Sequence, residues 1–170
     1  STLNEFLNNW WTTWENFGGL LRDLWEDFVE QEFPFRTLAA TSLAKGMLPQ
    51  WDPYIFAGMP FMADIQVAFW YPMNMLQSLF VSDGYLAPGV MQFFILIHTA
   101  LAGFGMYLFT KRIFRTDDLS AIFAGIAYAF SGYITAQVIH QMIVYHIAWF
   151  PLVAYAFVRG FDSWKHAILA

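Results

Sequence analysis

The sequence has no cysteine and few charged residues. The missing cysteine excludes disulfides, thiolate catalysis and cysteine-based metal sites. Charged residues make up only 12% of the 170 residues, whereas a soluble domain carries about 25%. The chain also has no strongly basic patch with interleaved aromatic residues, so nucleic-acid binding is not supported. It has instead 58% hydrophobic and 21% aromatic residues, a composition typical of a membrane protein.

The acidic and the apolar residues occupy different parts of the chain. Most acidic residues lie between residues 1 and 86, where only Arg22, Arg36 and Lys45 oppose them. Long apolar runs begin after this segment, and the remaining charges lie at their ends. We therefore predict an extracytoplasmic loop with interfacial helices over residues 1–86, followed by three transmembrane helices over residues 87–170.

Three apolar windows are long enough to cross a bilayer as helices. They run from about 89 to 110, 119 to 138 and 142 to 160, and none carries Asp, Glu, Lys or Arg in its interior. A hydrocarbon core of about 30 Å needs roughly 20 helical residues. Pro151 lies inside the third window, but membrane helices tolerate such a residue. The expected fold class is an all-α membrane protein with a mixed helical and irregular external loop.

Basic residues predict the orientation of these helices. They gather between the first two windows and after the third: Lys111, Arg112, Arg115, Arg159, Lys165 and His166. The positive-inside bias places both groups in the cytoplasm, so residues 1–86 and the turn near 138–142 share the external face. Residues 1–30 contain no signal-peptide pattern. We therefore expect a further span upstream and more spans after Ala170, which makes the chain a fragment of a longer protein.

The external segment is expected to be helical first and irregular afterwards. Residues 3–45 have a helical pattern that is interrupted at Gly18 and Gly19, and Pro34 is expected to stop or kink the helix. Between Gly46 and Pro72 the frequent prolines and glycines exclude long helices. Four carboxylates share one face of the helical part, at spacings of three and four residues: Asp23, Glu26, Asp27 and Glu30.

This acidic face is the candidate for chemistry. The sequence has no P-loop, GxGxxG, HExxH or GxSxG pattern, so the common nucleotide, metalloprotease and hydrolase signatures are absent. A carboxylate at an external membrane face can act as a general base towards a hydroxyl group or help to bind a divalent cation. The alternative is a solvated helix face, which is the commoner case for a run of charges.

Six motifs follow one another along the chain. Three lie in the external loop: WEDFVEQEFPFR (25–36), LPQWDPYIFAGMPFMADIQ (48–66) and FWYPMN (69–74). Three more lie in the expected spans: HTALAGFGMYLFTKRIF (98–114), FAGIAYAFSGYITAQVIHQ (123–141) and AWFPL (148–152). Together the motifs extend over most of residues 23–160, and in this order they resemble the bacterial YfhO-type family of multi-pass membrane proteins.

The resemblance implies a GT-C-like bundle of many transmembrane helices in the bacterial plasma membrane. Such enzymes transfer a sugar from a polyprenyl-phosphate carrier to an acceptor outside the membrane. The expected partners are therefore the polyprenyl-phosphate-linked sugar, the lipid bilayer and an envelope polymer or lipid acceptor. The alternative function is that of a non-catalytic membrane transporter or an accessory subunit of a membrane complex.

The resemblance also implies which residues form the site. Asp27 matches the family's essential acidic residue and is expected to be the base, or the acid that orients the acceptor. Gln31 lies one helical turn further on the same face. Asp64 and Gln66 belong to the second motif and would complete the site or a divalent-cation shell.

Two further residues are candidates for binding the donor's phosphate. Arg36 lies within the first motif and is the candidate cationic partner of the leaving phosphate. His140, at the external end of the second window, matches a family histidine and either binds the phosphate or caps the helix end. His98, inside the first window, is interpreted as a neutral, hydrogen-bonded residue between helices. Four glycines are expected to permit close helix packing: Gly103, Gly105, Gly125 and Gly132.

Overall fold

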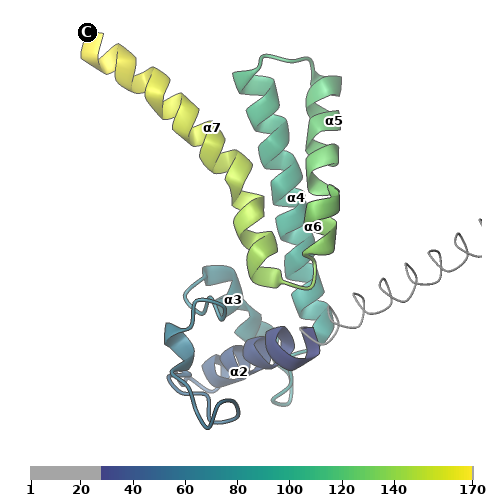
Figure 1. The fold of residues 1–170 in the computed structure, drawn as a ribbon, viewed down its shortest axis with the longest axis vertical. Helices are drawn as coiled ribbons and strands as arrows, with labels where there is room; N and C mark the ends of the chain where they lie inside the picture. The colour runs from purple at the N-terminus through teal and green to yellow at the C-terminus, as the bar shows by residue number, and fades with distance from the viewer. Residues whose placement is uncertain (1–27, 170) are drawn as a thin grey trace, which may run out of the picture.

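Helices form most of the structure. A computed structural model describes residues 28–169, with side chains as far as residue 161. Three segments are long and apolar enough to cross a membrane: Pro88–Ile113, Asp118–Ala136 and Gln141–Phe161. Strand-like pairing in the described residues is limited to two isolated bridges. The described part is therefore all-α, with three candidate membrane-spanning segments, as the sequence predicts (Figure 1).

The first and third spans are single helices, whereas the second is broken. The spans comprise four helices: α4 (Pro88–Ile113), α5 (Asp118–Ala129), α6 (Gly132–Ala136) and α7 (Gln141–Leu169). α7 continues through Pro151. The break between α5 and α6 falls at Ser131, whose hydroxyl accepts a hydrogen bond from the N–H of Ile134 at 3.4 Å. A serine cap gives the backbone a partner outside the helix ladder, and apolar composition does not reveal it.

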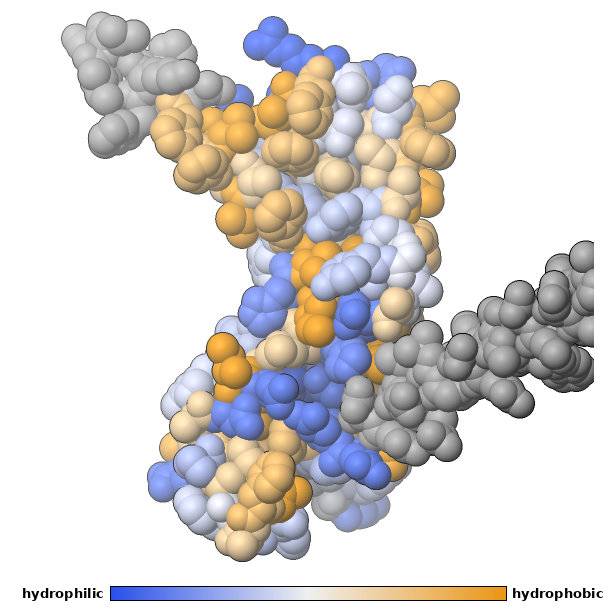
Figure 2. Space-filling view, in the orientation of Figure 1, coloured by the Kyte–Doolittle hydropathy of each residue, from blue (hydrophilic) through white to orange (hydrophobic). Residues whose placement is uncertain are grey.

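The connections between the spans lie at two opposite ends (Figure 1). The α4–α5 turn lies at one end, where Lys111 pairs with Asp118 and the Asp117 carboxylate accepts from the N–H of Ser120 at 2.7 Å. Residues 28–86 and the α6–α7 turn lie together at the other end. Figure 2 shows hydrophilic side chains at the α4–α5 turn and in a band across the segment at the other end, with hydrophobic ones prominent between them. This is the arrangement that a bilayer around the three spans requires.

The main helix of the segment outside the spans is α2 (Phe33–Ala44). It follows a π-helical turn, η1 (Phe28–Glu32), and Pro34 occupies one of its first positions. A proline there loses no helical hydrogen bond. The interruption expected at Pro34 is therefore a change from π-helical to α-helical geometry, and the helix begins at this point instead of stopping. Gly46, with a φ of 71°, ends α2 in a Schellman motif.

Apolar side chains attach α2 both to the loop that follows it and to the first span. The loop contains three short helical turns: η2 (Phe61–Ala63), α3 (Pro72–Leu76) and η3 (Gln77–Phe80). One core cluster joins α2 to this loop: Phe35, Ala39, Phe61, Val67 and Phe69. A second joins α2 to the beginning of α4: Ala40, Leu86 and Met91. α2 is thereby fixed crosswise at the end of the spans (Figure 1).

Part of the loop is a hairpin-like turn. The backbone N–H groups and carbonyls of Asp52 and Met59 bond to each other at 2.9 Å in both directions. Gly58 has a φ of 110°, and a Cβ atom there would lie 2.5 Å from Nε1 of Trp51, so the backbone passes beneath the indole only because the residue is glycine. The turn leaves Phe56 89% exposed at its tip.

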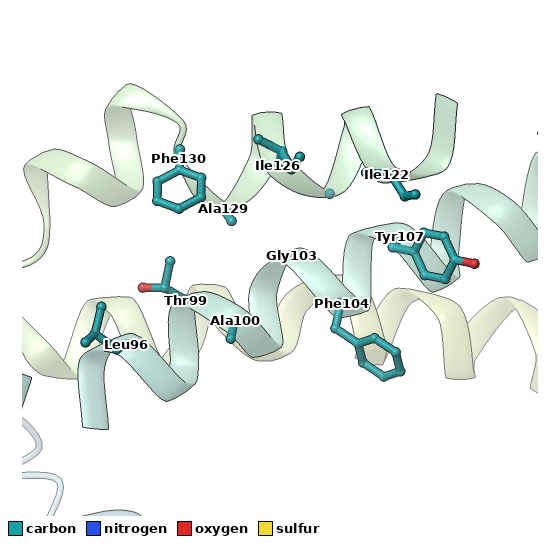
Figure 3. A pocket seen from close by; sticks show the side chains of 11 residues that line it. Leu96, Thr99, Ala100, Gly103, Phe104, Tyr107, Ile122, Ile126, Ala129 and Phe130 are labelled. Carbon is teal, nitrogen blue, oxygen red and sulfur yellow. The ribbon is translucent and has the colours of Figure 1, made fainter. Parts of the chain in front are cut away.

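Glycines allow the spans to approach closely at three of the four expected positions. A Cβ atom on Gly125 of α5 would lie 2.7 Å from the carbonyl oxygen of Gly103 on α4, and one on Gly105 would lie 2.9 Å from Leu152 of α7. Gly132 has nothing within 4 Å of such an atom, so the expectation of close packing is wrong there. Beside the Gly103–Gly125 contact, α4 and α5 enclose an apolar groove of about 460 Å³ (Figure 3).

Gly125→Ala is expected to lower the free energy of unfolding in detergent by about 1–2 kcal/mol. Overpacking costs about 1–3 kcal/mol, and the higher helix propensity of alanine recovers at most about 1 kcal/mol. Gly132→Ala is the matched control, because its new methyl group meets open space. Denaturation of the full-length protein followed by circular dichroism measures both; equal stability of the two variants would contradict the close contact.

Candidate functional site

Two glutamines join the η1 turn to the second motif of the loop. The Gln31 side-chain amide donates a hydrogen bond to Oε1 of Gln66. Gln66 is itself held by Asp64, whose Oδ1 accepts from the Gln66 backbone N–H at 2.7 Å. This local carboxylate–backbone bond is the usual way in which an aspartate fixes a turn. Three of the predicted site residues are thus in one hydrogen-bonded group, although 33 residues separate Gln31 from Asp64 in the sequence.

These residues line two adjoining cavities. Gln31, Asp64 and Gln66 line a cavity of about 490 Å³, and Gln31 and Gln66 also line a second of about 290 Å³. The second cavity is bounded by His140 and by the first residues of α7. Four of the six predicted site residues therefore meet at the end of the spans. Asp27, the predicted base, lies outside the described residues.

His140 lies immediately before α7. Its Nδ1 is 2.9 Å from Oε1 of Gln137, and its backbone carbonyl accepts from the N–H of Val144 at 3.2 Å, in the first turn of the helix. The carbonyl therefore takes part in starting α7, while the imidazole points to the α6–α7 turn and to the smaller cavity. A phosphate-binding role for this ring stays a prediction.

Arg36 is buried in an ion pair with Glu32, which the motifs do not indicate. The residue is 1% exposed, and its guanidinium donates to the carbonyl of Val67 and lies 3.5 Å from the carboxylate of Glu32. Burial raises the pKa of the Glu32 carboxyl, and the positive charge of Arg36 opposes that rise. Arg36 lines neither cavity. Its charge is used inside the protein, and its predicted contact with a leaving phosphate stays untested.

Glu32 is the residue that sequence reasoning missed. It is 9% exposed and lines the smaller cavity beside Gln31 and His140. The only signal in the sequence is its spacing of four residues from Arg36, which is that of a helical ion pair. That spacing is common on solvated helices, so burial of the pair is learned only from the fold.

A second polar group attaches the loop to two of the spans. Nδ1 of His98 lies 2.7 Å from the carbonyl oxygen of Phe94, so it carries the proton, and Nε2 accepts from the hydroxyl of Tyr71 at 2.6 Å. The indole N–H of Trp149 donates to the same hydroxyl at 2.8 Å. The ring of His98 also stacks on Tyr145, with centroids 3.7 Å apart. His98 is hydrogen-bonded as expected, but its side-chain partner is the loop and not another helix.

The side chains of the described residues include no group of three or more histidines, aspartates or glutamates placed to hold a metal ion. Asp64, the carboxylate proposed for a divalent-cation shell, is engaged with the Gln66 backbone. The second carboxylate oxygen of Asp64 takes no part in this bond, and divalent-cation binding stays a prediction.

The fold and the site together define a class. Residues 28–169 form a helical structure with three candidate membrane-spanning segments and a folded segment at one end of them. This is the organisation of a multi-pass membrane protein. The chain matches no protein-family model, no curated protein and no solved structure.

Proposed function

We propose that the protein is part of a bacterial membrane glycosyltransferase of GT-C type, which moves a sugar from a polyprenyl-phosphate carrier to an extracytoplasmic acceptor. The observation that carries the proposal is the meeting of Gln31, Asp64, Gln66 and His140 around two adjoining cavities at the end of the spans. These residues come from separate motifs, and a solvated acidic helix face would not need such a meeting. Asp27 directly precedes the η1 turn that carries Gln31.

The position of the cavities fits a lipid-linked donor. A polyprenyl chain remains between apolar helices, so its phosphate reaches only the polar layer where the spans end. The smaller cavity lies in that layer, beside the first turn of α7, and the positive end of a helix dipole favours an anion. The larger cavity shares the Gln31–Gln66 pair with the smaller one, and the proposal assigns the acceptor to it.

In the proposed reaction an acceptor hydroxyl attacks the anomeric carbon of the sugar. The new bond forms between the acceptor oxygen and this carbon, while the bond from the carbon to the phosphate oxygen breaks. The hydroxyl proton passes to Asp27, and polyprenyl phosphate leaves with the bonding electrons. The protein's main contribution is to hold the two reactants in line and to accept the proton.

Reconstitution of the full-length protein tests this function. Liposomes that contain the protein and a polyprenyl-phosphate hexose labelled in the sugar are mixed with candidate acceptors. A transferase consumes the donor only when an acceptor is present and releases unlabelled polyprenyl phosphate. Movement of intact donor across the bilayer, with no broken sugar–phosphate bond, would instead support the alternative function of a transporter.

A further inference from the structure

The two cavities of the candidate site continue into a third. This outermost cavity, of about 450 Å³, is lined by residues of α2 and by the hairpin-like turn, including Asp52 and Tyr54. It shares Glu30, Phe35 and Ile55 with the 490 Å³ cavity. That cavity in turn shares Gln31 and Gln66 with the 290 Å³ cavity beside α7. Because neighbouring cavities share lining residues, the three lie in a row from α2 and the hairpin-like turn to the beginning of α7, and we call this row the α2 trough.

The α2 trough is larger than one small ligand needs. Small-molecule sites usually measure about 300–1,000 Å³, and each of the two outer cavities falls within that range by itself. Only the innermost cavity lies beside α7, where the proposed donor would present its phosphate. The outer two therefore provide space for an extended acceptor that reaches beyond the reacting group.

The lining of the trough selects hydroxyl groups. Asp52 is 4% exposed and lines the outermost cavity; its Oδ1 accepts from the N–H of Tyr54 at 2.8 Å, and within the described residues no hydrogen bond reaches its Oδ2. Buried polar atoms normally have hydrogen-bond partners. Aromatic side chains in the two outer cavities add apolar faces, as in many saccharide sites: Phe33, Phe35, Tyr54 and Phe56.

The charges of the two outer cavities exclude a polyanion. Carboxylates line both of them: Glu30, Asp52 and Asp64. The carboxylate of the innermost cavity belongs to Glu32, which is paired with Arg36. No lysine or arginine is among the described residues that line the three cavities, since Arg36 is enclosed behind Glu32. Carboxylates accept hydrogen bonds from hydroxyl groups, but they repel phosphate and carboxylate groups at short range.

We infer that the α2 trough binds a saccharide chain that carries no negative charge, with the reacting end beside Gln31 and Gln66 and the far end at Asp52. This inference rests on the proposed function for the direction of the chain. It names a substrate class that the motifs do not: a neutral or amino-bearing glycan, not a phosphate-bearing polymer.

Calorimetric titration of the full-length protein in detergent tests the inference without any need for catalysis. The probes are the tetramer of N-acetylglucosamine, which is neutral, and the tetramer of galacturonic acid, which carries four negative charges. We expect the neutral tetramer to bind at least about tenfold more tightly at low salt, because like charges across an interface are strongly unfavourable. The difference should narrow at high salt as the charges are screened.

The variant Asp52→Asn tests whether the saccharide occupies the outermost cavity. The asparagine keeps the oxygen that accepts from Tyr54 and removes the charge, so the turn is retained. The neutral tetramer should bind about fivefold more weakly and the galacturonic acid tetramer more tightly. Asp83→Asn is the matched control: Asp83 is exposed, lines none of the three cavities, and its replacement changes the net charge equally.

Three results would overturn the inference: equal or tighter binding of the galacturonic acid tetramer, no binding of the neutral one, or the same response in the Asp83 variant as in the Asp52 variant. If the donor is not cleaved but the tetramers bind as expected, the proposed transferase function is wrong and the saccharide site stands. If the donor is cleaved but the neutral tetramer does not bind, the transferase function stands and the saccharide site is wrong.

Discussion

Arg36→Met is expected to lower the free energy of unfolding by about 3–5 kcal/mol, the usual cost of leaving one member of a buried ion pair alone. Glu32, whose side chain is only 11% exposed, would keep its carboxylate without the neighbouring positive charge. The carbonyl of Val67 would also lose its donor. Methionine fills much of the volume of arginine, so the loss reports charge and hydrogen bonding more than an empty space.

The double variant Glu32→Gln/Arg36→Met separates these causes. It leaves no buried charge, and replacement of a whole buried pair by neutral residues is often nearly neutral in stability, so most of the loss should be recovered. Lys45→Met is the control for removal of an exposed cation and should change stability by at most about 0.5 kcal/mol. If the double variant were as unstable as Arg36→Met, the Val67 bond and packing would be the cause instead.

The stability of Arg36→Met should also depend on pH. Without the arginine, burial raises the pKa of Glu32 further above its ordinary value of 4.5. The folded state then holds the Glu32 proton more tightly than the unfolded state does. The deficit relative to the wild type is therefore smaller at pH values below about 4.5, where the lost Val67 bond remains its main cause, and it grows as the pH rises through the raised pKa of Glu32. Unfolding curves across this range measure it.

The spans could be predicted from the sequence because length and apolar composition decide them. A run of about 20 residues without charges has few folds available in lipid other than a helix, and α4 and α7 follow that rule. The break at Ser131 could not be predicted in this way, since a single hydroxyl bond to the Ile134 N–H decides it. The open space around Gly132 follows from the same break, since α6 begins there.

The residues of the candidate site could be predicted only where they belong to one of the motifs. The motifs brought Gln31, Asp64 and Gln66 to attention, but the hydrogen bond between the two glutamines depends on how α2 packs against the loop. Arg36 shows the limit most clearly. Its charge is visible in the sequence, whereas its burial against Glu32 depends on tertiary structure. The hydrogen bond from Tyr71 to His98 likewise joins residues 27 positions apart, with no periodicity to predict it.

Asp27→Asn in the full-length protein is expected to reduce sugar transfer by about 10²–10⁴-fold, the range for loss of a general base. Asparagine is nearly the same size as aspartate but cannot accept the acceptor's proton. The loss should appear in kcat and in kcat/KM alike, because the proton moves only in the transition state. Asp23→Asn is the matched control: it lies one turn earlier on the same predicted helical face and removes the same charge.

The pH dependence of transfer gives this prediction a readout that a change in folding would not produce. In the wild type, transfer should fall at low pH as the Asp27 carboxylate takes up a proton and can no longer act as a base. In Asp27→Asn the small remaining activity should lack this decrease. Asp27→Glu should restore part of the rate, since it returns a carboxylate at a slightly longer reach. Normal transfer by Asp27→Asn at equal expression would contradict the role of Asp27 and would favour the transporter or accessory function, whatever the cavities bind.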